Sequence, residues 1–124
     1  VFYDLHRAGG VLLSQSALLK VVTANADALE NVFRKLIERR VKPYYLHHLD
    51  KAPGTSHFRV SIEKGKSLMR ALRGRVSGLC QPHYILDIPG GYGKVSITDS
   101  ALAKNDDGSY TVTDIHNKTH EYHD

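Results

Sequence analysis

Three apolar segments alternate with two amphipathic segments along most of the chain, and this order restricts the fold more than any other feature. We interpret the apolar segments as strands at residues 11–19, 44–50 and 83–87, with helices between them at 27–39 and 61–73. Strands joined through helices run parallel, so the sequence predicts an α/β fold of β-α-β units. Three such strands can neither close a barrel nor cover both faces of an open sheet. We therefore expect the C-terminal part of a larger parallel β/α barrel.

Both candidate helices have apolar residues at helical spacing. Asn25 or Asp27 is placed to cap the start of the first helix. Gly74 is placed to end the second, and Gly65 weakens that prediction because glycine is a poor helix former. The strand at 11–19 is expected to be buried on both faces, except where the polar side chains at its centre point.

After the third strand the pattern changes to short segments of alternating polarity. Residues 95–97 and 110–115 alternate like exposed strands, and Asn105-Asp-Asp-Gly108 is a strong hairpin-type turn signal. The polar residues 117–124 are expected to form a tail or an edge strand. This change of pattern predicts a small antiparallel β extension.

The sequence therefore predicts two parts. Residues 1–93 form the strands and helices of the barrel segment, and residues 94–124 form a β-hairpin-like C-terminal extension. The chain also begins with Val1-Phe2-Tyr3 and without methionine, from which we expect a piece of a longer protein.

The composition argues against several classes of function. The net charge is +4, but the basic residues are spread along the chain. Their densest group, from Arg34 to Lys42, fits a solvated helix face, and no aromatic residues interleave with it as on nucleic-acid-binding surfaces. No apolar run is long enough to span a bilayer. We expect neither a nucleic acid nor a membrane as a partner.

The cysteine and histidine residues do not predict a metal site. The single cysteine, Cys80, rules out an internal disulfide and a metal site of several thiolates, and it fits a small buried residue in a reducing, cytoplasmic setting. His47 and His48 are adjacent, so on a strand they face opposite sides and cannot both serve one site. The histidines near the C-terminal end fit an exposed tail better than an ordered metal site.

The segment Asp87-Ile-Pro-Gly-Gly-Tyr-Gly-Lys94 carries the clearest signal of a functional site. A candidate strand breaks at proline and continues through three glycines to a lysine. Glycine lets the backbone turn sharply and lets a ligand approach closely. By its chemistry, Lys94 can form an imine with a carbonyl cofactor, clamp a phosphate, or be an ordinary surface lysine. Val95 follows where a nucleotide P-loop has serine or threonine, so ATP binding is weakly supported.

Asp50 and Asp87 occupy equivalent positions, each at the C-terminal end of a predicted parallel strand and before a loop with proline and glycine. Ligands bind at this edge in parallel α/β folds. Two carboxylates there would bind a cation such as the amino group of a substrate. Alternatively, each aspartate only caps the turn that follows it. The residues alone leave both interpretations open.

Five ordered segments resemble, in order and spacing, the C-terminal part of lysine 2,3-aminomutase, a radical S-adenosylmethionine enzyme that uses pyridoxal phosphate. These segments are Gln15–Lys20, Pro43–Asp50, His57–Arg59, Arg73–Gly78 and Asp87–Lys94. The resemblance covers residues 1–97, and the family's β tail follows.

The resemblance implies an isomerase that moves the α-amino group of L-lysine to the β-carbon. Its cofactors would be pyridoxal 5′-phosphate, S-adenosyl-L-methionine and a [4Fe-4S] cluster. Lys94 would be the catalytic residue that binds pyridoxal phosphate covalently, and Gln15 would line the cofactor cleft. Asp50 and Asp87 would bind the ε-ammonium of the substrate. The related glutamate mutases lack this acidic pair, so its presence favours lysine.

The chain departs from the family pattern in two ways. The three-cysteine cluster motif CxxxCxxC is absent, so we expect the cluster ligands in the rest of the polypeptide and no activity from these 124 residues alone. Tyr92 stands where the family often has another glycine, which predicts a stiffer loop. The rest of its own polypeptide is thus an expected partner, and we also expect a homo-oligomer.

Two alternatives to an enzyme acting on free lysine remain. A close relative makes β-lysine for the modification of elongation factor P, although the long tail after Ile97 favours the free-lysine enzyme. A different class would be a non-catalytic binding module that kept the acidic pair and lost the chemistry.

Overall fold

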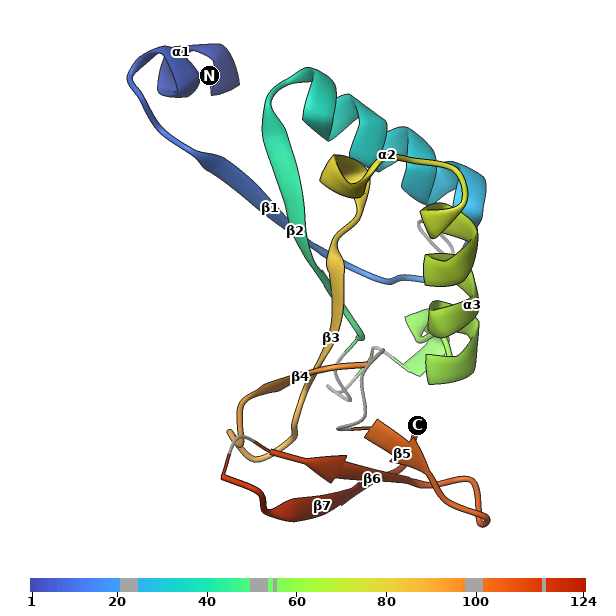
Figure 1. The fold of residues 1–124 in the computed structure, drawn as a ribbon. Coiled ribbons are helices and arrows are strands. Elements are labelled where there is room, and N and C mark those ends of the chain that lie inside the picture. Colours follow the sequence, from blue (N-terminus) through green and yellow to red (C-terminus); the bar gives the residue numbers. More distant parts are fainter. Residues whose placement is uncertain (21–24, 50–53, 55, 98–101, 115) are drawn as a thin grey trace.

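The larger sheet has four strands, and the first three are parallel, as the sequence predicts. A computed structural model describes residues 1–20, 25–49, 54, 56–97, 102–114 and 116–124 (Figure 1). The strands are β1 (Leu12–Ala17), β2 (Val41–His47), β3 (His83–Asp87) and β4 (Lys94–Ser96), and they lie side by side in this order. β4 turns back along β3 and pairs with it in the antiparallel direction. The first residues of the predicted extension therefore complete this sheet.

Two helices connect the parallel strands and lie together on one side of the sheet (Figure 1). They are α2 (Ala26–Glu38) and α3 (Ile62–Arg73), within one residue of the predicted bounds. Asn25 caps α2 by accepting a hydrogen bond from the Ala28 amide at 2.7 Å. Ser61 caps α3 in the same way. The short helices α1 (Phe2–Arg7), η1 (Ser56–Phe58) and η2 (Gly78–Cys80) were not predicted.

The hydrophobic core fills the space between the sheet and these helices. Apolar side chains of α2 and α3 meet those of β2 and β3, among them Leu29, Phe33, Leu46, Leu72 and Tyr84. Each of these five side chains is almost completely buried. Because alternate strand residues point to opposite faces, filling the core from one face leaves the other set of side chains on the opposite face.

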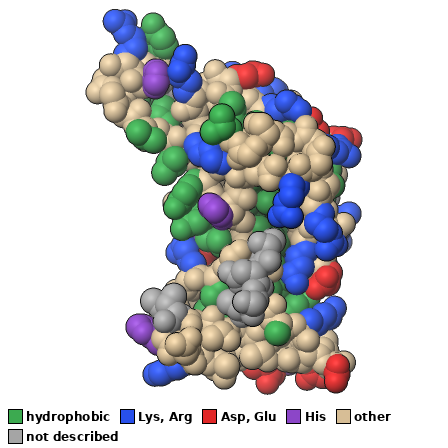
Figure 2. Space-filling model, viewed as in Figure 1, with side chains coloured by type: hydrophobic (Ala, Val, Ile, Leu, Met, Phe, Trp, Pro, Cys, Tyr) green, Lys and Arg blue, Asp and Glu red, His purple; other side chains and the backbone are tan. Residues whose placement is uncertain are grey.

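Two expectations for the first strands are wrong. The segment at 11–19 is not buried on both faces, because β1 lies at the edge of the sheet and Leu13 is half exposed. Figure 2 shows hydrophobic side chains along the left side of the molecule, where β1 lies in Figure 1. The second strand begins at Val41, where the sequence suggested only the end of the preceding helix. Arg40, with φ of 58°, makes the turn between them.

A β-bulge in β2 places two tyrosines on the same face of the sheet. Ser14 pairs with Pro43 and Gln15 pairs with Tyr45, so Tyr44 is the extra residue. The rings of Tyr44 and Tyr45 have centroids 4.4 Å apart. After the bulge the alternation resumes, and His47 and His48 point to opposite faces as predicted.

The C-terminal residues form a second, antiparallel sheet of β5 (Leu102–Lys104), β6 (Tyr110–Thr113) and β7 (Thr119–Tyr122). The predicted turn joins β5 to β6, and Gly108 adopts φ of 88° there. The hairpin partner of β6 is β5, whereas the sequence suggested residues 95–97. β7 is an edge strand, one of the two predicted alternatives.

The last residue joins this small sheet to the rest of the chain. The Asp124 carboxylate accepts hydrogen bonds from the buried His48 at 3.0 Å and from the Ile62 amide at the start of α3. Arg59 lies 3.4 Å from the same carboxylate. The extension is therefore anchored where β2 and α3 approach each other.

The described strands form two open sheets, and no closed barrel is present among them. Within the described part of the chain, no helix is both long enough and apolar enough to cross a membrane.

Gly65 fits its helix because Tyr84 occupies the space that a side chain would need. A Cβ at Gly65 would lie 2.1 Å from the Tyr84 hydroxyl, which also bonds to His48 in the core. We expect Gly65→Ala to lower the free energy of unfolding by about 1–3 kcal/mol, despite the better helix propensity of alanine. Urea unfolding measures this change.

Gly74→Ala is the matched control for this substitution. Gly74 has φ of −79°, and a Cβ there would lie at an ordinary 3.7 Å from the Ala71 carbonyl oxygen. This variant should be neutral or slightly more stable. Equal losses of stability in the two variants would contradict the role given to Tyr84.

Candidate functional site

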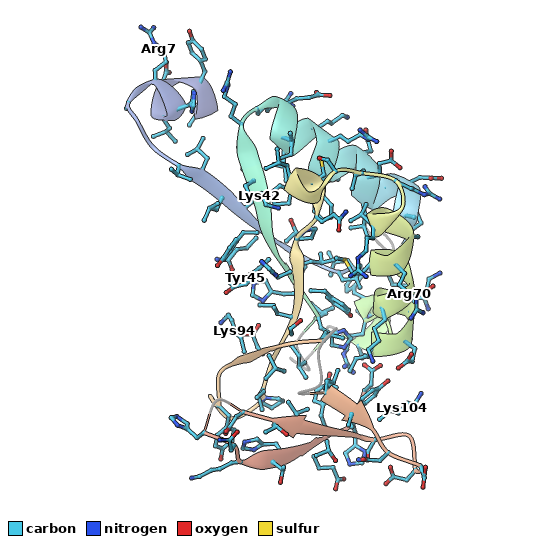
Figure 3. The ribbon with its side chains drawn as sticks, viewed as in Figure 1. Arg7, Lys42, Tyr45, Arg70, Lys94 and Lys104 are labelled. Carbon is cyan, nitrogen blue, oxygen red and sulfur yellow. The ribbon has the colours of Figure 1, made fainter. Side chains whose placement is uncertain are left out.

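Each strand of the larger sheet contributes one polar side chain to a line across the face opposite the helices. Gln15 comes from β1, His47 from β2, Asp87 from β3 and Lys94 from β4. Figure 3 shows Lys94 on this side of the strands, away from α2 and α3, with Tyr45 nearby. We call this surface the open face. Polar side chains are favoured there because solvent or a ligand can reach them.

Continuous contacts join the four side chains. Lys94 Nζ lies 2.9 Å from Asp87 Oδ1. The other carboxylate oxygen, Oδ2, lies 2.8 Å from His47 Nδ1. The opposite ring nitrogen of His47, Nε2, lies 2.8 Å from Gln15 Oε1. Asp87 therefore contacts a separate partner through each of its oxygens.

The charge of Asp87 is stabilised by these partners. Burial raises the pKa of the carboxyl group, but hydrogen bonds from Lys94 and His47 lower it by more, so the pKa lies below its usual range. The Asp87 side chain is 31% exposed and that of Lys94 is 48% exposed. The pair is thus an ionised carboxylate and an amine that ligands can approach.

The glycine loop between β3 and β4 brings Lys94 back beside Asp87. Gly90, Gly91 and Gly93 all have φ between 79° and 95°, which side-chain-bearing residues rarely adopt. The Ile88 amide donates to the Gly93 carbonyl at 2.9 Å and closes the loop. The strand pairing then sets Asp87 opposite Lys94. The three glycines are therefore required by the turn that creates the pair.

Tyr92 connects this loop to the small antiparallel sheet. Its ring has its centroid 4.2 Å from that of His120 on β7. His120 Nε2 in turn bonds to the buried Asp114 at 2.8 Å, and this bond, with two backbone amides, lowers the pKa of Asp114 to about 2. A Cβ at Gly90 would lie 2.7 Å from the Tyr92 ring. The loop is thus held at its tip by a residue of the extension.

A shallow hollow of about 300 Å³ lies beside Lys94 on the open face. Its lining includes Tyr45, Ile85 and Ser96. Ile85 is 4% exposed although it lies outside the main hydrophobic cluster. The hollow therefore combines an apolar floor and an aromatic ring with the amine of Lys94 at its edge.

The structure brings together three of the four residues that the sequence singled out. Gln15, Asp87 and Lys94 lie in one line of contacts, and Asp50 falls outside the described residues. Sequence reasoning missed His47 as a member of this group, because it considered this residue only as a metal ligand. The available signal was its place on the same strand face as Tyr45, beside the strand that ends in Asp87.

His48 and Cys80 take structural positions in the core. His48 is buried, and its ring bonds to Tyr84 and Asp124. Cys80 is buried as predicted. Over the residues that the structure describes, no group of three or more histidine, cysteine or acidic side chains is arranged to hold a metal ion.

Comparison with known proteins gives the relatives of this chain. It is 39% identical over 118 residues to a putative L-lysine 2,3-aminomutase of Aquifex aeolicus, across 95% of this chain. It is 34% identical over 111 residues to the L-lysine 2,3-aminomutase of Clostridium subterminale, across 90% of this chain. The chain is homologous to L-lysine 2,3-aminomutases. These homologues are isomerases.

The homology covers only a segment of each aminomutase. The match spans 32% of the Aquifex aeolicus protein and 24% of the Clostridium subterminale protein. The Escherichia coli L-lysine 2,3-aminomutase is 44% identical over 86 residues, which is 69% of this chain and 25% of that protein. No protein-family model matches the chain.

The contact between Tyr92 and His120 should limit the motion of the loop between β3 and β4. Tyr92→Ala removes an aromatic pair worth about 0.5–1.5 kcal/mol. Opening of the loop should then become roughly threefold to tenfold more frequent. Hydrogen exchange of the Ile88 amide, which bonds across the loop, measures this opening.

Tyr92→Phe is the control, because it keeps the ring and loses only the hydroxyl. Its exchange rate should stay near that of the unchanged protein, and His120→Ala should reproduce the effect of Tyr92→Ala. Equal exchange in all three variants would show that the ring contact does not hold the loop.

Proposed function

We propose that this chain is the lysine-binding and cofactor-binding segment of a lysine 2,3-aminomutase. The intact protein would convert L-lysine to β-lysine by moving the α-amino group to the β-carbon. Homology supports this proposal, and the pairing of Lys94 with Asp87 on the open face is the observation that carries it. That pairing places an amine and a carboxylate next to each other at an accessible surface.

The two side chains match the two amino groups of the substrate. L-lysine carries an α-amino group, which must be attached to a carbonyl group to react, and an ε-ammonium, which needs an anion. Asp87 supplies an ionised carboxylate, and charge-assisted hydrogen bonds fix a cation well. Asp50 would be its proposed acidic partner. Lys94 supplies the amine that can hold the carbonyl cofactor.

The residues on the open face fit pyridoxal phosphate. Lys94 lies at the edge of the hollow, which leaves room beside its amine. Lys94 would hold the cofactor, and Gln15 would lie along its cleft. When bound, pyridoxal phosphate supplies an aldehyde to which amino groups attach reversibly.

Asp87 cannot serve Lys94 and the substrate through the same oxygen at the same time. Lys94 Nζ lies against Oδ1, so it must leave this oxygen and lose a proton before its lone pair can react. Its departure frees Oδ1 for the substrate ammonium. The flexible lysine side chain therefore exchanges one partner for another, while Asp87 stays in place on β3.

The chain does not fit an iron–sulfur cluster. It contains one cysteine, and Cys80 is buried. The cluster ligands would lie in the rest of the polypeptide, and we assign no residue here to S-adenosylmethionine.

The outer edge of β1 carries no partner strand among the described residues. A preceding strand of a β/α barrel would continue the sheet at this edge. The predicted boundary between residues 1–93 and residues 94–124 stays a prediction, and so does the homo-oligomer.

Borohydride reduction of the intact protein with pyridoxal phosphate tests the proposal. Reduction makes the link between amine and cofactor permanent, and peptide mapping then identifies the residue. We expect a phosphopyridoxyl group on Lys94 and none after Lys94→Arg, which keeps the charge but cannot form the link. Modification of another residue alone, or of none, would overturn the proposal and favour the non-catalytic binding module.

Asp87→Asn tests the substrate role of the carboxylate. Loss of the negative charge should weaken the binding of L-lysine by about 1.5–3 kcal/mol, the range of a hydrogen bond to a charged group. Calorimetry without S-adenosylmethionine measures binding in the absence of turnover. Asp106→Asn, in the exposed β5–β6 turn, is the control for a lost surface charge. Unchanged affinity in Asp87→Asn would remove Asp87 from the substrate site.

A further inference from the structure

His47 lies at the centre of the line of contacts on the open face, and the proposed function gives it no role. It is the residue that joins Gln15 to Asp87. An ionised carboxylate can only accept hydrogen bonds, so Nδ1 of His47 must carry a proton and donate it to Asp87 Oδ2. The side chain of His47 is 22% exposed. A ring nitrogen that donates a proton is thus fixed against the carboxylate.

The orientation of the His47 ring is itself determined by its neighbours. Gln15 contacts the far nitrogen from β1 at 2.8 Å. Tyr45, two residues earlier on β2, meets the ring edge-on, with centroids 5.8 Å apart and an angle of 76° between the planes. The ring is therefore restrained at one nitrogen and at one edge. Its remaining nitrogen is aimed at Asp87.

The two oxygens of Asp87 have different neighbours, and only one of these neighbours must move. Oδ1 contacts Lys94, which has to leave when it turns to the cofactor. Oδ2 contacts His47, which sits on a strand and takes no part in that movement. After Lys94 leaves, His47 is the remaining one of the two donors that offset the burial of the carboxylate. Without it, the carboxylate could rotate or become protonated.

We propose that His47 is a positioning residue for substrate selection. It holds Oδ2 of Asp87 so that Oδ1, once released by Lys94, faces the terminal ammonium of an amino-acid substrate. The role rests on the proposed function, since it needs a substrate with a distant positive charge. In this role, His47 fixes one oxygen of Asp87, and the other oxygen binds first Lys94 and then the substrate ammonium.

Three substitutions separate this role from general support of the fold. His47→Phe keeps a ring next to Tyr45 and removes the donor. His47→Asn keeps a donor near the position of Nδ1 and loses the contact with Gln15. His47→Gln places its amide near the position of Nε2, where it can reach Gln15. The matched pair of amides therefore tests which of the two ring contacts matters.

The measurement is calorimetric binding to the intact, cofactor-loaded protein in the absence of S-adenosylmethionine. The two ligands are L-lysine and L-norleucine, which has an apolar end in place of the ammonium. We expect His47→Phe to weaken L-lysine roughly tenfold or more and to change L-norleucine less than about threefold, because only the first ligand uses Asp87. His47→Asn should keep most of the affinity for L-lysine, and His47→Gln should resemble His47→Phe.

A double-mutant cycle with Asp87→Asn completes the test. If His47 acts through Asp87, adding His47→Phe to Asp87→Asn should change L-lysine binding by less than about threefold. An equal loss for both ligands, a full additional loss in the double variant, or unchanged L-lysine binding in His47→Phe would each overturn the proposal. Borohydride labelling of Lys94 is measured in the same variants. Absence of the label from the unchanged protein defeats the proposed function instead, whereas a normal label with any of these three results defeats only the role of His47.

Discussion

The one-sided packing of the larger sheet is the constraint on which the site depends. Because α2 and α3 cover a single face, that face takes the apolar side chains of β2 and β3, and the alternation of the strands sends the intervening side chains to the open face. Four neighbouring strands then need only one polar residue each to form a continuous line of contacts. The core and the candidate site are therefore two results of the same strand pattern.

The elements that could be predicted are those with regularly spaced apolar residues and with residues that mark where the element begins or ends. The helix bounds followed from apolar spacing, from Asn25 as one of the two predicted caps of α2, and from Gly74 as the predicted end of α3. The third strand was correct because proline and glycine end it abruptly. The parallel order followed from the alternation of strands and helices. The turn at Asn105–Gly108 was also clear, since glycine with positive φ is its local requirement.

The parts that sequence reasoning missed depend on contacts between distant segments. Local pattern did not reveal that β1 is an edge strand, that β6 pairs with β5, or that Asp124 reaches the start of α3. Among the site residues, Lys94 and Asp87 lie in one short motif and could be named together. His47 could not be grouped with them, because its partners lie on two other strands and only the strand register brings them within bonding distance.

The bulge at Tyr44 decides which side chains of β2 after it face the helices and which face the open side. An unbroken pleat of the same length would turn His47 under the helices and bring His48 into the open. By absorbing one position, the bulge keeps the same parity that a strand with a single tyrosine would have. Loss of one tyrosine together with the bulge would therefore leave the downstream side chains on their original faces. With the bulge, β2 keeps His48 buried and His47 accessible although it carries one residue more than the segment of β1 that it pairs with.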